Sequence, residues 1–324
     1  MKKNKIYIFL SFFFVISNFF AQNAYANFIA SGETLSTSNY EIRSLDLTGE
    51  VEDARDVTFN NDGTKMFTID NGPRKVIEYN LSTPYNISTA VIGNDFFVNE
   101  NTQPFKVKFN NNGSKMFILG RSGKNIYEYS LSSSFDITSA TYTGNFVNVS
   151  AQVSNTLFGL AFSPDGKMMF VSESVDGLHQ YSLNKSFDLS GGVNFIRSAD
   201  VPTYLDGATQ NGLAFNQSGT RMFLIDSAAN AVNQYTLSEG FNIATASLDG
   251  GAVSSIDPNG ITFSPSGLRM YVSGKDEAIK EHHLPCPFNL FAGKCTEITE
   301  GDRRGVAEAQ INIANRTIEH STDT

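Results

Sequence analysis

The regular pattern of the chain starts at Val57, where apolar and polar positions begin to alternate over short stretches. Residues 57–59 alternate as in a half-buried strand, and residues 65–69 form the returning strand after a short polar interval. That interval, residues 60–63, contains Asn and Asp, whose side chains cap turns, and a glycine that accepts a positive φ angle. The pattern therefore predicts a β-hairpin over residues 57–69.

The same hairpin recurs four more times at a nearly constant spacing. Related segments begin at Val107, Leu160, Leu213 and Ile261. The turn glycines, which are separated by 50, 53, 53 and 48 residues, are Gly63, Gly113, Gly166, Gly219 and Gly267. Each hairpin precedes a third strand, which ends in Tyr-x-Leu in the first four copies, then an aromatic-polar-aliphatic triplet and a more variable fourth strand. Such a period of short strands is typical of a β-propeller with one four-stranded blade per repeat.

The two ends of the pattern indicate how the ring closes. One further triplet, at residues 40–42, precedes the first repeat, and a strand-like stretch follows it at residues 43–48. The fifth repeat stops near Phe288 without a fourth strand. We therefore predict an all-β fold in which residues 40–290 form five blades of four antiparallel strands, with the N-terminal strand completing the fifth blade. The alternative is an incomplete ring of six or seven blades, which a period of ~50 residues makes harder to fit.

One sequence motif connects these repeats to known propellers. The third hairpin reads FSPDGK at residues 162–167, and the strand after it ends in Tyr-Ser-Leu at residues 181–183. This combination resembles the YVTN-type and lactonase-like propeller repeats of secreted bacterial proteins, and the likeness extends over about three quarters of the chain. The resemblance implies a propeller and leaves the function open, because propellers host both enzymes and pure binding modules. The chain has no Trp, so the WD-repeat signature is absent.

Residues 1–26 carry the three-part pattern of a secretory signal peptide. Three lysines within residues 2–5 precede an apolar run over residues 6–20, and Ala-Tyr-Ala at residues 24–26 provides a small-residue cleavage site. The apolar run is shorter than the ~20 residues that a membrane-spanning helix needs, although an uncleaved anchor is the alternative. We predict a mature protein that starts at Asn27, with a lead-in of residues 27–39 and no membrane span. It would be secreted or held at the bacterial cell surface.

Charge and cysteine content narrow the choice of partners. The formal net charge is −9, only 18% of the residues are charged, and no Lys/Arg cluster is present to neutralise phosphates, so nucleic acid is not expected as a partner. Cys286 and Cys295 follow the last blade, and in an exported chain we expect them to form a disulfide that closes a short loop. A zinc site is not expected, since these thiols with His282 and His283 lack the usual ligand spacing.

Residues 291–324 leave the repeat pattern and are predicted to be a linker with a short helix. Ile311 and Ile318 lie seven residues apart with alanines in step beside them, which indicates a weakly amphipathic helix. Residues 289–322 resemble the segment that joins passenger regions to an outer-membrane barrel in some autotransporter-like proteins of marine bacteria. The resemblance implies that the propeller is an autotransporter passenger and a fragment of a larger surface protein.

The candidate ligand-binding residues lie in two sets of loops that we expect at one mouth of the central channel. The loops that lead into the inner strands carry Asp56, Asn211 and Asn259. The loops between the second and third strands carry Asp70, Glu173 and Asp226. Carboxylate and amide oxygens around one axis predict a ligand site, and they are the donors that a hard cation such as calcium prefers. The alternative is that these residues only form turns.

No catalytic residue is predicted. His179 falls in a third strand, away from the expected mouth, and His282 replaces a packing tyrosine, so we expect structural roles for both. The G-x-S-x-G motif of serine hydrolases is absent. The sequence therefore offers no legible nucleophile and base.

These features favour an exported binding or adhesion module whose ligand is a glycan, a protein or a small molecule. Similar blades offer similar pockets and gain by multivalency, whereas catalysis needs different residues on different blades. The alternative is a metal-dependent lactonase-like hydrolase, because Asn-Gly at residues 211–212 and 259–260 resembles the metal-ligand asparagines of gluconolactonase-like propellers. That resemblance is incomplete, since Phe105 and Phe158 hold the matching positions of two other repeats. A third alternative is a rigid spacer without a ligand.

Overall fold

The computed structural model describes residues 41–100, 103–174, 177–201, 210–253 and 257–291. The predicted signal peptide, the lead-in and the C-terminal helix lie outside these residues, and so does Cys295. Cys286 is described and is buried. Within the described ranges, no helix is long and apolar enough to cross a membrane.

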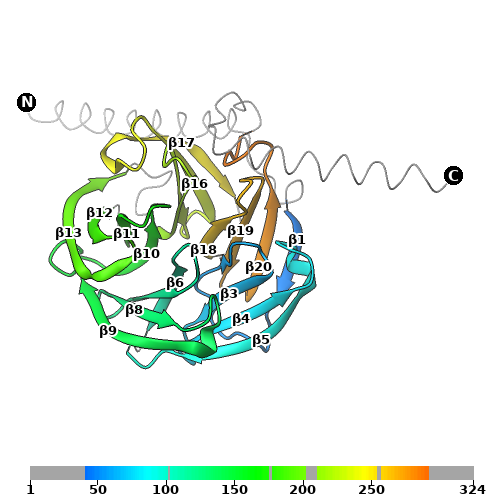
Figure 1. Cartoon of the computed structure of the whole chain (residues 1–324). Coiled ribbons are helices and arrows are strands. Elements are labelled where there is room, and N and C mark those ends of the chain that lie inside the picture. Colours follow the sequence, from blue (N-terminus) through cyan, green and yellow to red (C-terminus); the bar gives the residue numbers. More distant parts are fainter. Residues whose placement is uncertain (1–40, 101–102, 175–176, 202–209, 254–256, 292–324) are drawn as a thin grey trace, which may run out of the picture. The chain divides into compact units, whose positions relative to one another are not determined.

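Every repeat forms a four-stranded antiparallel sheet, and the five sheets surround one axis, as predicted (Figure 1). The first blade holds β2 (Thr58–Phe59), β3 (Lys65–Asp70), β4 (Lys75–Leu81) and β5 (Ala90–Phe97). The second holds β6 (Pro104–Phe109), β7 (Lys115–Gly120), β8 (Asn125–Leu131) and β9 (Ala140–Asn148). The third holds β10 (Leu157–Phe162), β11 (Met168–Glu173), β12 (Gly177–Lys185) and β13 (Asp188–Asp200). The fourth holds β14 (Gln210–Phe215), β15 (Arg221–Asp226), β16 (Ala231–Leu237) and β17 (Ala246–Val253).

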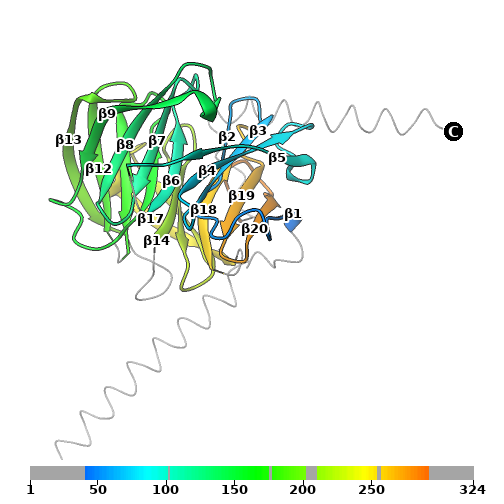
Figure 2. The same cartoon turned by 90° about the horizontal axis from the view of Figure 1, so that it is seen from below.

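The fifth blade combines both ends of the propeller, which confirms the predicted closure. It holds β18 (Pro258–Phe263), β19 (Arg269–Gly274) and β20 (Ala278–His283), and its outermost strand is β1 (Glu41–Asp46). The strand β1 lies beside β20 (Figure 2), and the two run antiparallel with Leu45 opposite Ile279. The strand lies two residues earlier than residues 43–48, because the chain turns after Asp46, whose carboxylate accepts a hydrogen bond from the Thr48 N–H.

Apolar packing between neighbouring blades forms the core. Each of five clusters joins one blade to the next, so the hydrophobic surface is divided around the ring rather than gathered in one centre. The methionine at the second position of each second strand is fully buried in every repeat: Met66, Met116, Met169, Met222 and Met270. Packing of every blade on two neighbours makes each one dependent on ring closure.

The aromatic residue of each triplet packs against the turn glycine of its own repeat. Gly113 has a φ of 69°, and its carbonyl accepts a hydrogen bond from the Phe135 N–H at 3.0 Å. The Phe135 ring lies over the glycine so closely that a Cβ on Gly113 would be 2.2 Å from Cδ2 of the ring. In three repeats the triplet then begins a short 3₁₀ helix: η1 (Ile87–Thr89), η2 (Ile137–Ser139) and η3 (Ile243–Thr245). The triplet seen in the sequence is therefore a turn that an aromatic ring and a glycine fix together.

Replacing Gly113 with Ala is expected to lower the free energy of unfolding by about 2–5 kcal/mol. The left-handed backbone contributes about 1–2 kcal/mol, and the displaced ring adds about 1–3 kcal/mol. Urea unfolding would measure the change.

Gly144→Ala separates the two causes of that loss. Gly144 has a φ of 83° and no atom within 4 Å of an added Cβ, so its replacement reports backbone strain alone. If the two variants lost equal stability, the ring contact would not contribute.

Candidate functional site

Five equivalent residues at the start of the inner strands form a contact chain around the axis. Asn259 Oδ1 accepts hydrogen bonds from Asn211 Nδ2 at 3.3 Å and from Arg55 at 3.2 Å. The Arg55 guanidinium lies 5.2 Å from the centre of the Phe105 ring, which in turn lies 5.2 Å from the Phe158 ring. The mouth therefore has an amide side and a side built from cations and phenyl rings.

Lys106 occupies the next level along the axis and joins three blades. Its Nζ donates hydrogen bonds to the main-chain carbonyls of Arg55 in the first blade and Asn259 in the fifth. The side chain is fully buried, and burial lowers the pKa of Lys106 to about 7, against the attraction of Asp56. A Cβ on Gly260, in the equivalent position of the fifth blade, would lie 2.5 Å from Cα of Asp56. The first and fifth blades approach each other so closely here that only glycine fits at position 260, next to Lys106.

Asp56, which is also predicted to line the mouth, connects the first blade to the second. Its carboxylate accepts hydrogen bonds from the Val107 N–H at 3.0 Å and from Lys108 Nζ at 2.9 Å. Only 1% of the residue is exposed. The structure therefore places Asp56, Asn211 and Asn259 near the axis, with Asp56 held in an ion pair, and their contact with a ligand stays a prediction.

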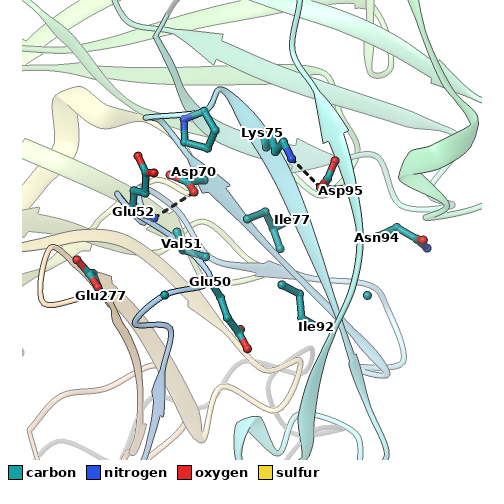
Figure 3. Close-up of a pocket in the computed structure, with 13 residues that line it drawn as sticks. Glu50, Val51, Glu52, Asp70, Lys75, Ile77, Ile92, Asn94, Asp95 and Glu277 are labelled. Atoms are coloured by element: carbon teal, nitrogen blue, oxygen red, sulfur yellow. Dashed lines mark hydrogen bonds and ion pairs between the residues drawn. The ribbon is translucent and has the colours of Figure 1, made fainter.

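Asp70, Glu173 and Asp226 instead end their second strands and bind loop backbone. Asp70 accepts hydrogen bonds from the Glu52 and Asp53 N–H groups, both at 3.1 Å, and Figure 3 shows the first of these. Burial raises the pKa of Asp70 even though these two N–H groups oppose the shift. Glu173 accepts a hydrogen bond from the Asn155 N–H, and Asp226 accepts one from the Ala229 N–H at 3.1 Å. These carboxylates position the loops around the mouth, and their predicted contact with a ligand stays a prediction.

A pocket of about 530 Å³ opens between the second and third blades next to the mouth. Its wall includes Arg121, Lys124, Ser154 and Asn155. The Arg121 guanidinium lies 4.5 Å from the centre of the Phe158 ring and 5.2 Å from that of Phe105. Among the residues that the structure describes, no carboxylate forms an ion pair with this guanidinium, since the nearby Asp53 is paired with Arg55 at 2.6 Å.

The electrostatics of this pocket favour an anion. Burial and the nearby charge of Arg55 both lower the pKa of Arg121, yet a guanidinium remains charged at neutral pH. Lys124, on the same wall, already donates to the Val153 and Ser154 carbonyls. Arg121 is therefore the cation in this pocket that is available to a ligand.

A second pocket, of about 440 Å³, has the opposite charge and lies between the loop at residues 49–52 and strands β4 and β5 (Figure 3). Glu50, Glu52, Asp95 and Glu277 line it, and Lys75 pairs with Asp95 at 2.8 Å. Across the described part of the chain, no group of three or more His, Cys, Asp or Glu side chains is placed to hold a metal ion. The calcium site stays a prediction.

Sequence reasoning missed Lys106 and Arg121. A signal for Lys106 was present, because three of the other repeats have glycine at the equivalent position: Gly159, Gly212 and Gly260. A long side chain at a position that otherwise requires glycine indicates a special role at the axis. Arg121 gave no comparable signal, since an arginine in a loop is ordinary.

Comparisons with known proteins find similar structures at low scores and no relative by sequence. No protein-family model matches the chain, and no curated protein matches it. A functionally unknown protein from Desulfotomaculum acetoxidans is similar in structure, with a TM-score of 0.43 and 12% identity over 68% of this chain and 62% of that one. A candidate 6-phosphogluconolactonase from Bacteroides uniformis has a TM-score of 0.45 and 13% identity over 67% of this chain and 63% of that one.

A third solved structure is similar at the same level. The β-propeller domain of Cps50 (Swd1) from Myceliophteria thermophila has a TM-score of 0.45 and 8% identity, over 75% of this chain and 99% of that one. The chain spans less than two thirds of the length of the first two proteins, at 62% and 63%. At such scores and identities, these likenesses carry no argument about what the chain binds or does.

Proposed function

We propose that the protein is an exported binding module that holds an anionic group of its ligand at the mouth of the propeller. The observation that carries the proposal is the guanidinium of Arg121, which pairs with no carboxylate of the described residues and is stacked on Phe158 and Phe105 at the edge of a pocket. Export rests on the predicted signal peptide. The C-terminal resemblance supports display as the passenger of a larger cell-surface protein, where the propeller would act in adhesion or capture.

The chemistry of the pocket favours carboxylate, sulfate or phosphate groups. One guanidinium offers two parallel N–H donors to such an anion, and the phenyl rings behind Arg121 keep water from one of its faces. Arg55, whose guanidinium also lies against Phe105, is already paired with Asp53 at 2.6 Å, so Arg121 is the cation that an anion would meet. Acidic glycans and small organic acids, both present outside cells, are the ligand classes that fit.

We expect Arg121→Gln to weaken binding of an acidic ligand at least tenfold. A hydrogen bond to a charged group contributes about 1.5–3 kcal/mol, and glutamine is a shorter, polar side chain without the charge. Titration calorimetry with oligogalacturonate, malonate and inorganic phosphate would measure the affinities, and a thermal scan would confirm that the variant is folded.

Arg74→Gln is the matched control for that variant. The Arg74 guanidinium also lies over a phenyl ring, 4.7 Å from the centre of Phe97. Phe97, however, lies on β5, the outer strand of the first blade. This variant should bind as the wild type does. Equal losses in both variants, or wild-type affinity in Arg121→Gln, would place the site elsewhere, and no binding of any anion would favour the rigid spacer.

The metal-dependent lactonase-like hydrolase is the second candidate, and one observation favours it. Asn211 Oδ1 is buried without a hydrogen-bond partner among the described residues, so it could accept a cation. Arg55 and Lys106, which both contact Asn259, oppose a cation at the same place. Thermal scans with calcium and with a chelator test whether a cation binds here, because a metal that binds the folded state raises the melting temperature. A calcium-dependent rise together with lactone hydrolysis would support the hydrolase.

A further inference from the structure

Three side chains on neighbouring strands of the third blade form a hydrogen-bonded chain. Ser198 Oγ lies 2.7 Å from His179 Nδ1, and His179 Nε2 lies 3.2 Å from Glu173 Oε1. The serine is on β13 directly opposite His179 on β12, and the glutamate ends β11. A hydroxyl, an imidazole and a carboxylate in this order form the arrangement that activates a serine for nucleophilic attack.

The partners of the imidazole determine its tautomer. An ionised carboxylate only accepts hydrogen bonds, so Nε2 carries the proton that is shared with Glu173. Nδ1 then has a free lone pair and accepts the hydrogen bond from the Ser198 hydroxyl. This is the protonation state that a general base needs, although the two ring nitrogens have exchanged the roles that they have in serine proteases.

The serine of this chain is exposed, whereas its two partners are buried. Ser198 is exposed, whereas His179 and Glu173 are 3% and 5% exposed. The second oxygen of Glu173 accepts a hydrogen bond from the Asn155 N–H, which fixes the carboxylate. A buried, oriented carboxylate and imidazole behind a hydroxyl in contact with solvent is what a reactive serine requires.

Only the third blade has this combination. The positions equivalent to Glu173, His179 and Ser198 hold Asp70, Ile77 and Asp95 in the first blade and Gly120, Tyr127 and Phe146 in the second. They hold Asp226, Asn233 and Gly251 in the fourth and Gly274, Lys280 and Ser44 in the fifth. The fold itself therefore does not need a Ser-His-Glu chain at these positions. Catalytic chemistry, unlike blade packing, calls for this kind of asymmetry between repeats.

We propose that Ser198 is a nucleophile activated by His179 and positioned through Glu173, and that it accepts acyl groups from carboxylic esters. The Ser198 oxygen would bond to the acyl carbon while its proton passes to Nδ1 of His179. The C–O bond to the alcohol then breaks, and the alcohol leaves with that proton. Water, deprotonated by the same nitrogen, releases the carboxylic acid and restores the serine. Because Ser198 lies on an outer strand, short O-acyl groups on an extended molecule such as a glycan are the substrate class that would reach it. This proposal does not rest on the proposed anion site at the mouth.

A fluorophosphonate probe tests the nucleophile directly. Attack by Ser198 forms an O–P bond and breaks the P–F bond, and because fluoride is a good leaving group, labelling reports on the serine itself. Mass spectrometry of the labelled full chain should place the adduct on Ser198, at a rate roughly 100-fold above that of an ordinary exposed serine, as expected for general-base assistance. Ser198→Ala should abolish this labelling, and it should also abolish any hydrolysis of p-nitrophenyl acetate above the background of the buffer.

Ser247 supplies the matched control. It is exposed on the outer strand β17 of the fourth blade, opposite Thr236, so Ser247→Ala should label as the wild type does. His179→Ala should reduce labelling to background, and added imidazole should restore part of it, which a purely structural histidine would not allow. Glu173→Gln should lower the rate at least about tenfold while Ser198 remains the labelled site.

Reaction of wild-type Ser198 at the same slow rate as Ser247 would overturn the proposal, because the chain of hydrogen bonds would then be only structural. Labelling that survives His179→Ala without imidazole would also overturn it. Ser198→Ala, an exposed surface change, is expected to fold, so the test does not depend on the buried variants.

Discussion

A chain that begins at Leu47 is expected to lose most of its folding stability and to self-associate. This truncation removes β1, which supplies the fourth strand of the fifth blade and joins the two ends of the propeller. It also removes Arg43, which pairs at 2.7 Å with the fully buried Glu281. Leaving a buried carboxylate without one partner costs about 3–5 kcal/mol, although Arg269 at 3.6 Å would offset part of this. The loss of this ion pair together with the loss of β1 removes a large share of the roughly 5–15 kcal/mol that stabilises a typical domain.

Self-association follows from the edge that the truncation exposes. Without β1, one side of β20 has unpaired N–H and C=O groups over residues 278–283, and such an edge pairs with other chains. Urea unfolding and light scattering would measure both effects. A chain that begins at Tyr40 keeps β1 and should match the chain that begins at Asn27. If the chain starting at Leu47 unfolded at the same urea concentration as these controls and remained monomeric, β1 would not close the ring.

The propeller architecture could be predicted from the sequence because each of the five repeats carries the same pattern of strands and turns. Gly113 and Phe135 lie 22 residues apart, and a glycine and an aromatic residue recur 21 or 22 residues apart in every repeat, so the five copies support one another. The closing strand was also predictable, since the triplet at residues 40–42 has a position in the repeat that only the end of a blade can take. The exact bounds of β1 were not, because the turn at residues 46–49 depends on one side-chain hydrogen bond.

The site was less predictable because residue type does not reveal where a side chain finds its partner. Asp70 and Asp226 occupy equivalent loops and were predicted to face a ligand, yet the contacts of Asp70 are backbone N–H groups of its own blade. Ser198 and His179 are 19 residues apart in sequence and meet only through the register of β12 and β13. Strand register depends on turn lengths and bulges, one of which lies beside His179 between Gln180 and Tyr181. Local patterns cannot supply that information.

Replacing Lys106 with Met is expected to remove a pH dependence of stability between about pH 7 and pH 9.5. Burial lowers the pKa of Lys106 to about 7, whereas an unfolded chain restores it to about 10.5. Between these values the unfolded chain binds one more proton than the folded protein, so the free energy of unfolding of the wild type rises with pH. The slope is at most about 1.4 kcal/mol for each pH unit. Below about pH 7 both states hold the proton, so Lys106 no longer makes the free energy of unfolding depend on pH.

The difference between wild type and variant isolates the lysine from all other titrating groups. Urea unfolding at several pH values from about 6 to 9.5 would give the two curves, and stopping there keeps tyrosines protonated in the unfolded chain. The wild-type curve should rise relative to that of Lys106→Met above about pH 7, and the two should run parallel below it. Lys75→Met, which replaces an exposed lysine of the outer surface, should follow the wild type throughout. Parallel curves for wild type and Lys106→Met across the whole range would mean that Lys106 remains protonated at the axis, held by Asp56 and the two carbonyls.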